Sequence, residues 1–423
     1  MNESSQNSRR DFLRKSALLG VATSVGSPLF GQIPRATPAA TMAGKADLKI
    51  TDVKVYTPGG GGRGGGDGAG GGGGGIFVEV MTDAGISGWG QCSGGDGVLM
   101  RQFIEGRFKR NIVGENPLAI RKLWDLMYYE HHDLGPSGTL SCALSGVDIA
   151  LWDLTGRVLN VPIYRLLGGN FRDGSVKAYG SIGTNRWGMT VEECVRRSVE
   201  FVEAGFGCVK LRWQIREHYL NPIDDRGLEY VAAVRKAVGD KVVLMVDGNN
   251  GYSPQRAISM GLKYYEKYNV TYFEDPTSDQ NVEALGMVSA ALDHVYIVAG
   301  EMCYTKWQIN DLIRFGKPDI INPDVCKSCG ITEMDRMATI AQLYQIQMQP
   351  HSTMQTIGTA AALQLLAALP NPAEFLECTS MDMGPNSLYR FFHNKIRLEK
   401  GVFYLPEGPG LGLEPNADLI RRS

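Results

Sequence analysis

The sequence lacks an excess of charge of either sign, because 43 Lys and Arg residues balance 45 Asp and Glu residues and leave a formal net charge of −2. Such a chain has no basic field for a nucleic-acid partner, so we expect none. It also lacks an apolar run of the roughly 18 residues that a membrane span requires. Hydrophobic residues nevertheless make up 43% of the 423 residues, which is enough for a large core and more than one domain.

Cysteine is scarce and scattered, with eight residues in the whole chain. This excludes a disulfide framework of the kind that staples small secreted domains. Cys326 and Cys329 form a CxxC pair, but no second pair lies near them in the sequence. Zinc is therefore not expected, and small buried side chains are favoured over a redox role.

The first 43 residues resemble a twin-arginine export signal. Arg9 and Arg10 are followed by Asp-Phe-Leu, then by a short and weakly apolar run and a stretch of small residues. This pattern predicts export of the folded protein, to the periplasm or beyond, after removal of the segment. The alternative interpretation is a disordered basic tail.

Residues 44–170 have the pattern of an α+β domain. A run of glycines at 59–75 interrupts it between the first two expected strands, and this run is either a flexible insert without a role or a lid over an active site. The expected strands are Leu48–Tyr56, Ile76–Met81 and Ile86–Gln91, and the expected helices are Leu99–Ile112, Pro117–Tyr129 and Thr139–Val158. In the last of these helices, Asp148 and Asp153 are interpreted as a solvated or capping face.

Residues 171–385 contain apolar runs that end in a charged residue or histidine at intervals of 23 to 27 residues. A strand, a helix and their two turns need roughly 25–30 residues, so this interval predicts a repeated βα unit and a parallel barrel. The C-terminal residues of barrel strands meet at one end of the barrel. These residues are Asp247, Glu274, Glu301, Asp324, His351 and Glu377. We expect residues 386–423 to pack back on the first domain.

Three carboxylates in succession, Asp247, Glu274 and Glu301, would repel one another at this end unless a cation lay between them. Carboxylate oxygens suit hard cations, so the sequence predicts a Mg²⁺ site, with Mn²⁺ as an alternative. Each acid could instead have its own separate partner, but their regular spacing argues against that interpretation.

Candidate acid–base groups flank this site. Lys210 and Arg212 alternate on one expected strand and therefore share a face. His351 and Asp324 end neighbouring strands, and a carboxylate beside an imidazole fixes its tautomer for general acid–base catalysis. Glu377 would reach the same end of the barrel.

The chain resembles the enolase superfamily, in its mandelate racemase/muconate lactonizing subgroup. The matching segments run in order from residue 85 to residue 377: GISGWG, ALSGVDIALWDLTGRVLNVPIYRLLGG, KLR, VDGN, FEDP, GE, NPDVCKSCGIT, PHS and LE. The resemblance implies an α/β fold, a modified (β/α)₇β TIM barrel with an α+β N-terminal capping domain, and a symmetric homo-oligomer. It also implies Mg²⁺ at Asp247, Glu274 and Glu301, a His351–Asp324 pair, and Glu377 as the acid of the eighth strand.

Two features depart from the family pattern. Many relatives carry Lys-x-Lys where this chain has Lys210 and Arg212, and arginine is a poor general base because it keeps its proton. The glycine run also stands where the family has a loop that closes over substrate. Other residues would then have to recognise the substrate, and the candidates are Asn249, His131 and His132. The two histidines could equally be exposed loop residues.

The resulting hypothesis is a Mg²⁺-dependent lyase that removes the proton α to a carboxylate and eliminates water from a sugar acid. A racemase, epimerase or cycloisomerase acting on a carboxylate substrate is the alternative. A sugar-acid binding protein without turnover is a third interpretation, which the complete set of acid–base residues disfavours.

Overall fold

A computed structural model of the chain describes residues 47–58, 75–93, 97–169, 171–184, 189–213, 221 and 225–423. The predicted export signal and nearly all of the glycine run, residues 59–74, lie outside the described residues. The described residues all belong to one compact unit, Gly44–Ser423. Within them, no helix is both long enough and apolar enough to cross a membrane.

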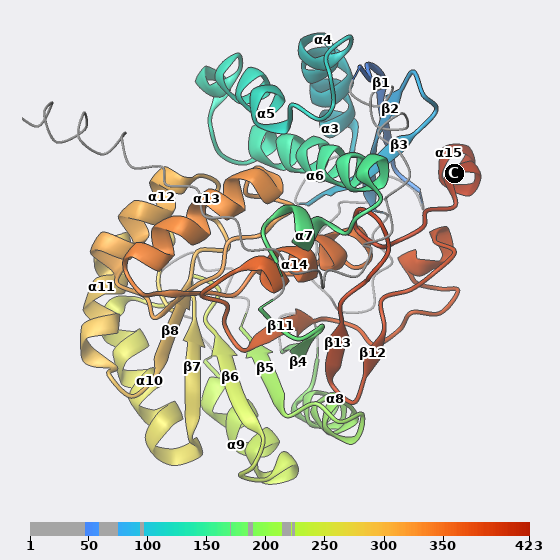
Figure 1. The fold of residues 1–423 in the computed structure, drawn as a ribbon. Helices are drawn as coiled ribbons and strands as arrows, with labels where there is room; N and C mark the ends of the chain where they lie inside the picture. Colours follow the sequence, from blue (N-terminus) through green and yellow to red (C-terminus); the bar gives the residue numbers. More distant parts are fainter. Residues whose placement is uncertain are drawn as a thin grey trace, which may run out of the picture. The chain divides into compact units, whose positions relative to one another are not determined.

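The N-terminal domain is built from an antiparallel sheet and the helices that follow it in the chain (Figure 1). The sheet has the order β1-β2-β3 and confirms the three predicted strands. The strands are β1 (Ile50–Tyr56), β2 (Ile76–Thr82) and β3 (Ser87–Cys92). The helices are α3 (Gly97–Phe103), the π-helix η1 (Ile104–Phe108), α4 (Lys109–Ile112), α5 (Ile120–Tyr129), the 3₁₀-helix η2 (His132–Leu134), α6 (Thr139–Leu159) and α7 (Ile163–Leu166).

Helix α6 packs directly on the backbone of β3, and two glycines make this possible. A Cβ added to Gly88 would lie 2.1 Å from the carbonyl oxygen of Ala150, and one added to Gly90 would lie 1.9 Å from that of Gly146. Real Cβ atoms do not approach so closely, so any other residue would push the helix off the sheet. The Gly-x-Gly spacing of the GISGWG segment is therefore explained by packing.

Among the described residues, eight parallel strands form the barrel of the second domain, in the order in which they occur in the chain. The last strand pairs with the first, and Met348 bridges to Pro372 just before the last strand, so the sheet closes on itself. The strands are β4 (Ser175–Gly183), β5 (Cys208–Arg212), β6 (Val243–Asp247), β7 (Val270–Glu274), β8 (Tyr296–Ala299), β9 (Ile320–Ile321), β10 (Gln347–Met348) and β11 (Phe375–Cys378).

In the described part of this domain, one helical segment follows each of the first seven strands, and the helices surround the sheet (Figure 1). This confirms the predicted (β/α)₇β barrel. The segments are α8 (Val191–Glu203), α9 (Gly227–Val238), α10 (Pro254–Tyr268), α11 (Val282–Ala291), α12 (Lys306–Asp311) with the π-helix η4 (Leu312–Gly316), α13 (Gly330–Leu343) and α14 (Ile357–Ala368).

The C-terminal segment contacts both domains. It contains the 3₁₀-helix η5 (Leu388–Phe391), β12 (Leu398–Glu399), β13 (Val402–Tyr404) and α15 (Ala417–Arg422). Strand β13 pairs antiparallel with β4 of the barrel. Arg421 forms an ion pair with Glu79 of β2, whose side chain is fully buried. The segment therefore packs on the N-terminal domain, as predicted, and also extends the barrel sheet.

Asp148 and Asp153 were predicted to lie on a solvated or capping face of their helix, and the solvated interpretation is wrong because both side chains are 0% exposed. Asp153 accepts hydrogen bonds from the backbone N–H groups of Trp89 and Leu411, each at 2.9 Å. Asp148 accepts hydrogen bonds from Thr332, at the start of a barrel helix. The helix is buried on more than one side, which its periodicity alone does not reveal.

Candidate active site

The C-terminal ends of the barrel strands bring the predicted residues into register. Arg212 is paired with Asp247, and Asp247 is paired with Glu274, across three neighbouring strands. The three remaining acid–base positions lie close by: an isolated bridge joins Asp324 to His351, and Glu377 lies within β11. The site is thus assembled where the βα repeat predicted it.

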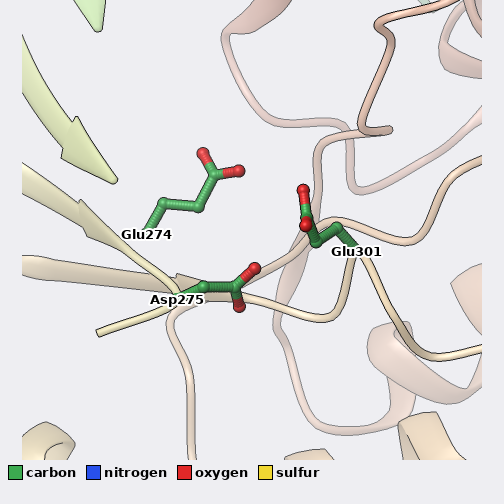
Figure 2. Close-up of side chains that lie close together, drawn as sticks. All are labelled: Glu274, Asp275 and Glu301. Carbon is green, nitrogen blue, oxygen red and sulfur yellow. The ribbon is translucent and has the colours of Figure 1, made fainter. Parts of the chain in front are cut away.

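Three carboxylates face one another at this end of the barrel: Glu274, Asp275 and Glu301 (Figure 2). One oxygen from each lies within 4.8 Å of the other two. Glu274 and Asp275 are adjacent in sequence, and side chains in a strand normally alternate between its faces. Asp275 escapes this rule because its φ of 36° takes the backbone out of the extended conformation directly after β7.

Asp247 lies at the predicted end of the barrel, paired with Glu274 on the neighbouring strand, and its place as a metal ligand stays a prediction. Its carboxylate is not a member of this group, and its Oδ2 lies 3.9 Å from Nζ of Lys210. Lys210 is 1% exposed and also contacts Glu274, at 2.6 Å. Of the predicted metal ligands, the structure brings Glu274 and Glu301 within 4.8 Å of each other and of Asp275. Asp247 lies outside this group and, like Glu274, contacts Lys210.

The cluster has the electrostatic character of a cation site. Burial, followed by the charges of Glu301 and Glu274, raises the pKa of Asp275 well above its usual range. Burial also raises the pKa of Glu274 to about 7, although the Lys210 ammonium acts in the opposite direction. Oδ2 of Asp275 is buried and has no hydrogen-bond partner among the described residues. A hard divalent cation would satisfy that oxygen and relieve the repulsion, so the residues present fit such an ion.

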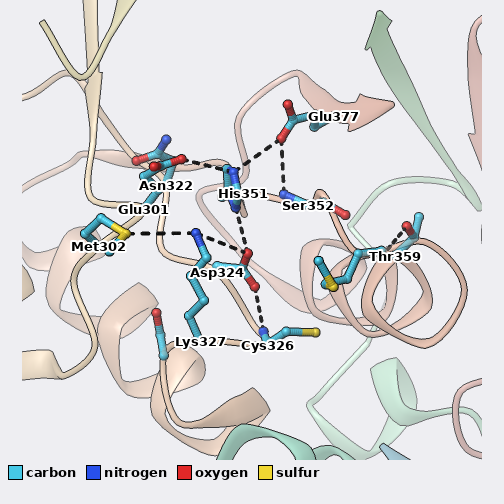
Figure 3. Close-up of polar contacts among 12 residues, drawn as sticks. Glu301, Met302, Asn322, Asp324, Cys326, Lys327, His351, Ser352, Thr359 and Glu377 are labelled. Carbon is cyan, nitrogen blue, oxygen red and sulfur yellow. Dashed lines mark hydrogen bonds and ion pairs between the residues drawn. The ribbon is translucent and has the colours of Figure 1, made fainter. Parts of the chain in front are cut away.

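His351 and Asp324 form the predicted pair (Figure 3). Nδ1 of His351 lies 2.7 Å from Oδ2 of Asp324, and Nε2 lies 3.0 Å from Oε2 of Glu301. Burial and the Lys327 ammonium lower the pKa of His351, but Glu301 and Asp324 outweigh them and raise it to about 10. The imidazole is therefore fixed at one nitrogen and directs the other toward the acid cluster.

Two residues at the site were missed by the sequence analysis. Lys327 is 14% exposed at its side chain and lies 4.0 Å from Oδ2 of Asp324. Its charge is the main influence that opposes burial and lowers the pKa of Glu301. Asn322 donates a hydrogen bond to Oε1 of Glu274 at 3.0 Å. Both belong to the NPDVCKSCGIT segment, from which only Asp324 was named as a candidate catalytic residue.

Arg212 and Glu377 contain polar atoms without partners. Arg212 is 4% exposed, and its Nε and Nη2 have no hydrogen-bond partner among the described residues. The same holds for Oε1 of Glu377, which lies 3.6 Å from Nζ of Lys210. Oε2 of Glu377 lies 3.7 Å from Nε2 of His351. Burial raises the pKa of Glu377, but Lys210 and His351 outweigh it and lower the pKa to about 2.

The two histidines predicted to contact substrate differ in their exposure to solvent. His131 is 8% exposed, packs against Phe103 and Phe108, and has its Nε2 3.1 Å from Oδ1 of Asn111. These contacts place it in the core of the N-terminal domain. His132 is exposed, with its Nδ1 2.9 Å from the carbonyl oxygen of Tyr129. Within the described residues, neither histidine is hydrogen-bonded or ion-paired to the acid cluster.

Asn249 lies two residues after Asp247, and its backbone N–H donates to Oδ1 of that carboxylate at 2.8 Å. It is therefore at the end of the barrel where substrate is expected. Cys326 and Cys329 are both 0% exposed, and burial raises the pKa of each thiol. They are small buried residues, as the sequence analysis favoured.

Two family descriptions match this chain. Residues 74–168 match the N-terminal domain of the mandelate racemase/muconate lactonizing enzymes, and residues 193–419 match the enolase C-terminal domain-like family. A solved structure of a mandelate racemase/muconate lactonizing protein from Paracoccus denitrificans, complexed with magnesium, is 32% identical with a TM-score of 0.78. The match covers 89% of this chain and 98% of that chain.

Relatives of this chain carry the names of enzymes that act on sugar acids or their lactones. A D-galactarolactone cycloisomerase from Agrobacterium fabrum is 30% identical over 82% of this chain and 90% of its own length. A D-xylonate dehydratase from Haloferax volcanii is 30% identical over 89% of each chain. Together with the barrel, the capping domain and the acid cluster, these matches show that the chain belongs to the enolase superfamily of enzymes, in its mandelate racemase/muconate lactonizing subgroup.

Proposed function

We propose that this enzyme is an acid-sugar dehydratase, and the placement of His351 is the observation that supports it most. Its Nδ1 is held by Asp324 at 2.7 Å, and its Nε2 faces the acid cluster, with Glu301 at 3.0 Å and Glu377 at 3.7 Å. The charge of Glu301 is the main influence that raises the pKa of this imidazole, so a cation bound to Glu301 would lower that pKa again. Nε2 could then remove a proton from a carbon beside a carboxylate that is held at the cluster.

In this proposal, Nε2 of His351 takes the proton from the α-carbon of a 2,3-dihydroxy acid, and Asp324 stabilises the imidazolium that results. The electron pair of the C–H bond forms a double bond to the β-carbon, and the β-hydroxyl leaves. His351 returns its proton to that hydroxyl, which departs as water. The remaining enol tautomerises to a 2-keto-3-deoxy acid.

We propose Mg²⁺ for the acid cluster, with Mn²⁺ as an alternative, because the donors are carboxylate oxygens. Glu274, Asp275 and Glu301 would hold it, with Asp247 as the fourth candidate. Such an ion supplies positive charge where the substrate carboxylate gains negative charge as its α-proton leaves. The solved relative from Paracoccus denitrificans is described as a magnesium complex, which supports this choice.

The residues on β5 would hold the substrate. Lys210 keeps its proton, because Glu274, Glu377 and other neighbours raise its pKa well above the usual range despite burial. Arg212 adds two buried N–H donors that lack a protein partner. A substrate carboxylate or hydroxyl that accepts from them would remove the cost of leaving charged donors unpaired.

A cycloisomerase is the second candidate, because one of the relatives carries that name. A racemase or epimerase fits less well, since it needs a second base on the opposite face of the α-carbon, and arginine is a poor general base. A binding protein without turnover would have no use for the imidazole held by Asp324.

The test is a screen of aldonic and aldaric acids with the purified protein and Mg²⁺, followed by detection of keto acids. Parallel incubations in D₂O report exchange of the α-proton. Keto-acid formation with loss of water supports the dehydratase. Exchange at the α-carbon without loss of water would instead establish a racemase or epimerase and reject the proposal.

We further propose that the segment around Arg9 and Arg10 directs export, as the sequence pattern predicts. Replacing both arginines by lysine and comparing periplasmic with cytoplasmic fractions tests this. Equal export of the two forms would reject it.

A further inference from the structure

The segments that carry Asp324 and His351 lead directly into two barrel helices, α13 and α14. Among the described residues, these helices lack a hydrogen bond from their own N-cap side chains. Helices α8, α10 and α11 have such bonds, from Thr190, Ser253 and Asn281 respectively. The first N–H groups of a helix need acceptors, so those of α13 and α14 must find them elsewhere.

The N-terminal domain supplies these acceptors. Oδ2 of Asp148, in α6, accepts from the backbone N–H of Thr332 at 2.9 Å, and its Oδ1 accepts from the Thr332 hydroxyl at 2.6 Å. Oε1 of Gln91, in β3, accepts from the backbone N–H of Gly358 at 2.9 Å. Asp148 and Gln91 are both 0% exposed. Each helix is therefore capped by a side chain from the other domain.

Further contacts tie the segment between Asp324 and α13 to the same domain. The backbone N–H of Ser93 donates to the carbonyl oxygen of Cys326 at 3.1 Å, and Nε1 of Trp124 donates to that of Cys329 at 2.9 Å. Within this segment, the N–H of Cys326 donates to Oδ1 of Asp324 at 2.7 Å. The carboxylate that holds His351 is thus linked to the capping domain through one residue.

Gly330 shows how closely Asp148 approaches. A Cβ at this position would lie 2.4 Å from Oδ2 of Asp148, and the φ of 83° belongs to the left-handed region. Burial raises the pKa of Asp148 to about 7, against the hydrogen bonds from Thr332. A buried acidic side chain held at such a cost, at the positive end of a helix, needs an explanation beyond packing.

We propose that Asp148 and Gln91 are positioning residues, through which the capping domain fixes the Asp324–His351 pair by capping α13 and α14. The inference rests on the proposed role of His351 but not on any particular substrate. It predicts that loss of either cap disturbs the hydrogen bond between the imidazole and Asp324 while the domain stays folded.

The test compares Asp148→Ala and Gln91→Ala with Asp153→Ala in the full chain. Asp153 is a matched control because it lies on the same helix and is equally buried, but it bonds to Trp89 and Leu411 and to no residue of the α13 or α14 segments. The readout is the Nδ1–H signal of His351 in protein labelled with ¹⁵N-histidine. His351→Asn assigns that signal among the six histidines.

We expect the signal to broaden or move in Asp148→Ala and Gln91→Ala and to stay unchanged in Asp153→Ala, although all three lower the melting temperature. Equal disturbance by the control, or no disturbance by either cap variant, would overturn the proposal. If Asp148→Ala does not fold, Gln91→Ala carries the test on its own, because it removes the acceptor for the backbone N–H of Gly358 at the start of α14.

On any sugar acid that the screen identifies, displacement of the pair should lower kcat by about 10- to 100-fold. KM should change by less than about threefold, because the cap residues do not touch substrate. Asp148→Asn, which keeps an acceptor for Thr332, should restore most of kcat. A changed His351 signal in a protein that turns over no sugar acid would reject the proposed function and leave the positioning role standing.

Discussion

The two sides of the site differ in how completely their polar groups are paired. On the side of β9 and β10, His351 has a partner at each ring nitrogen, and Asp324 uses both of its oxygens. On the side of β5, Lys210 contacts three carboxylates, but Arg212 keeps two buried N–H groups without a partner in the described structure. The first side is fully paired without substrate, whereas the second has donors that a substrate could pair. Under the proposed function, acid–base catalysis would belong to the first side and recognition to the second.

Removing the imidazole should have the largest effect. Replacement His351→Asn eliminates the base while nearly preserving its volume, and we expect kcat for water elimination to fall by about 10²- to 10⁴-fold. Substrate affinity measured by calorimetry should change little, because the β5 side is intact. Turnover close to that of the wild type would show that the base lies elsewhere and would reverse the assignment of the two sides.

The acid cluster can be tested by removing its ion and its ligands. Chelator should abolish turnover, and added Mg²⁺ should restore it. Asp275→Asn should weaken Mn²⁺ binding, followed by electron paramagnetic resonance, by at least about tenfold. Asp247→Asn provides the comparison, since the sequence predicts Asp247 as a ligand and the structure groups Asp275 with Glu274 and Glu301. A larger loss of Mn²⁺ affinity in Asp247→Asn than in Asp275→Asn would show that Asp247 is the ligand, as the sequence predicts.

Replacing Arg212, on the β5 side of the site, should change KM. Arg212→Met keeps the length and bulk of the side chain and removes its donors. A hydrogen bond to a charged group is worth about 1.5–3 kcal/mol, so KM should rise by about 10- to 100-fold. Arg212→Lys should recover only part of this, because an ammonium cannot reproduce the planar guanidinium. A loss confined to kcat would mean that Arg212 takes part in the chemistry instead.

The smallest expected effect concerns stability and pH at Asp148. Its pKa in the folded protein, about 7, lies above the value of 3.8 for a free side chain. Between these values the folded state binds a proton that the unfolded state lacks, so stability falls as pH rises, by about 1 kcal/mol per pH unit. Asp148→Asn should lack this contribution. Denaturant unfolding of both proteins at pH 5, 6 and 7 measures how the free energy of unfolding depends on pH. The same dependence in both proteins would contradict the prediction.

Much of the fold could be predicted because one periodic signal repeats along the barrel. The interval between charged strand ends located the strands, and the apolar stripes located the helices between them. The site was only partly predictable, since strand alternation places residue 275 outside the barrel, whereas a left-handed φ turns its carboxylate inward. Similarly, Lys327 lies in a loop whose path no periodicity describes.

The N-terminal domain was harder to interpret for a related reason. Helical spacing assigned Asp148 to a polar face of α6 but could not reveal that a second helix terminus meets that face. His131 was considered as a substrate contact or an exposed residue, and it packs between two phenylalanines instead. Both cases depend on contacts between residues distant in the sequence, which a single sequence does not contain.

The shared capping of α13 and α14 has a consequence for engineering new specificity by exchanging domains among relatives. A transplanted N-terminal domain would have to bring an acceptor for the N–H of Thr332 and another for that of Gly358, whatever its loops contribute. Chimaeras lacking these two acceptors would assemble with an intact ion site and a misaligned imidazole. A chimaera should therefore take Gln91 and Asp148 from the same parent protein as α13 and α14.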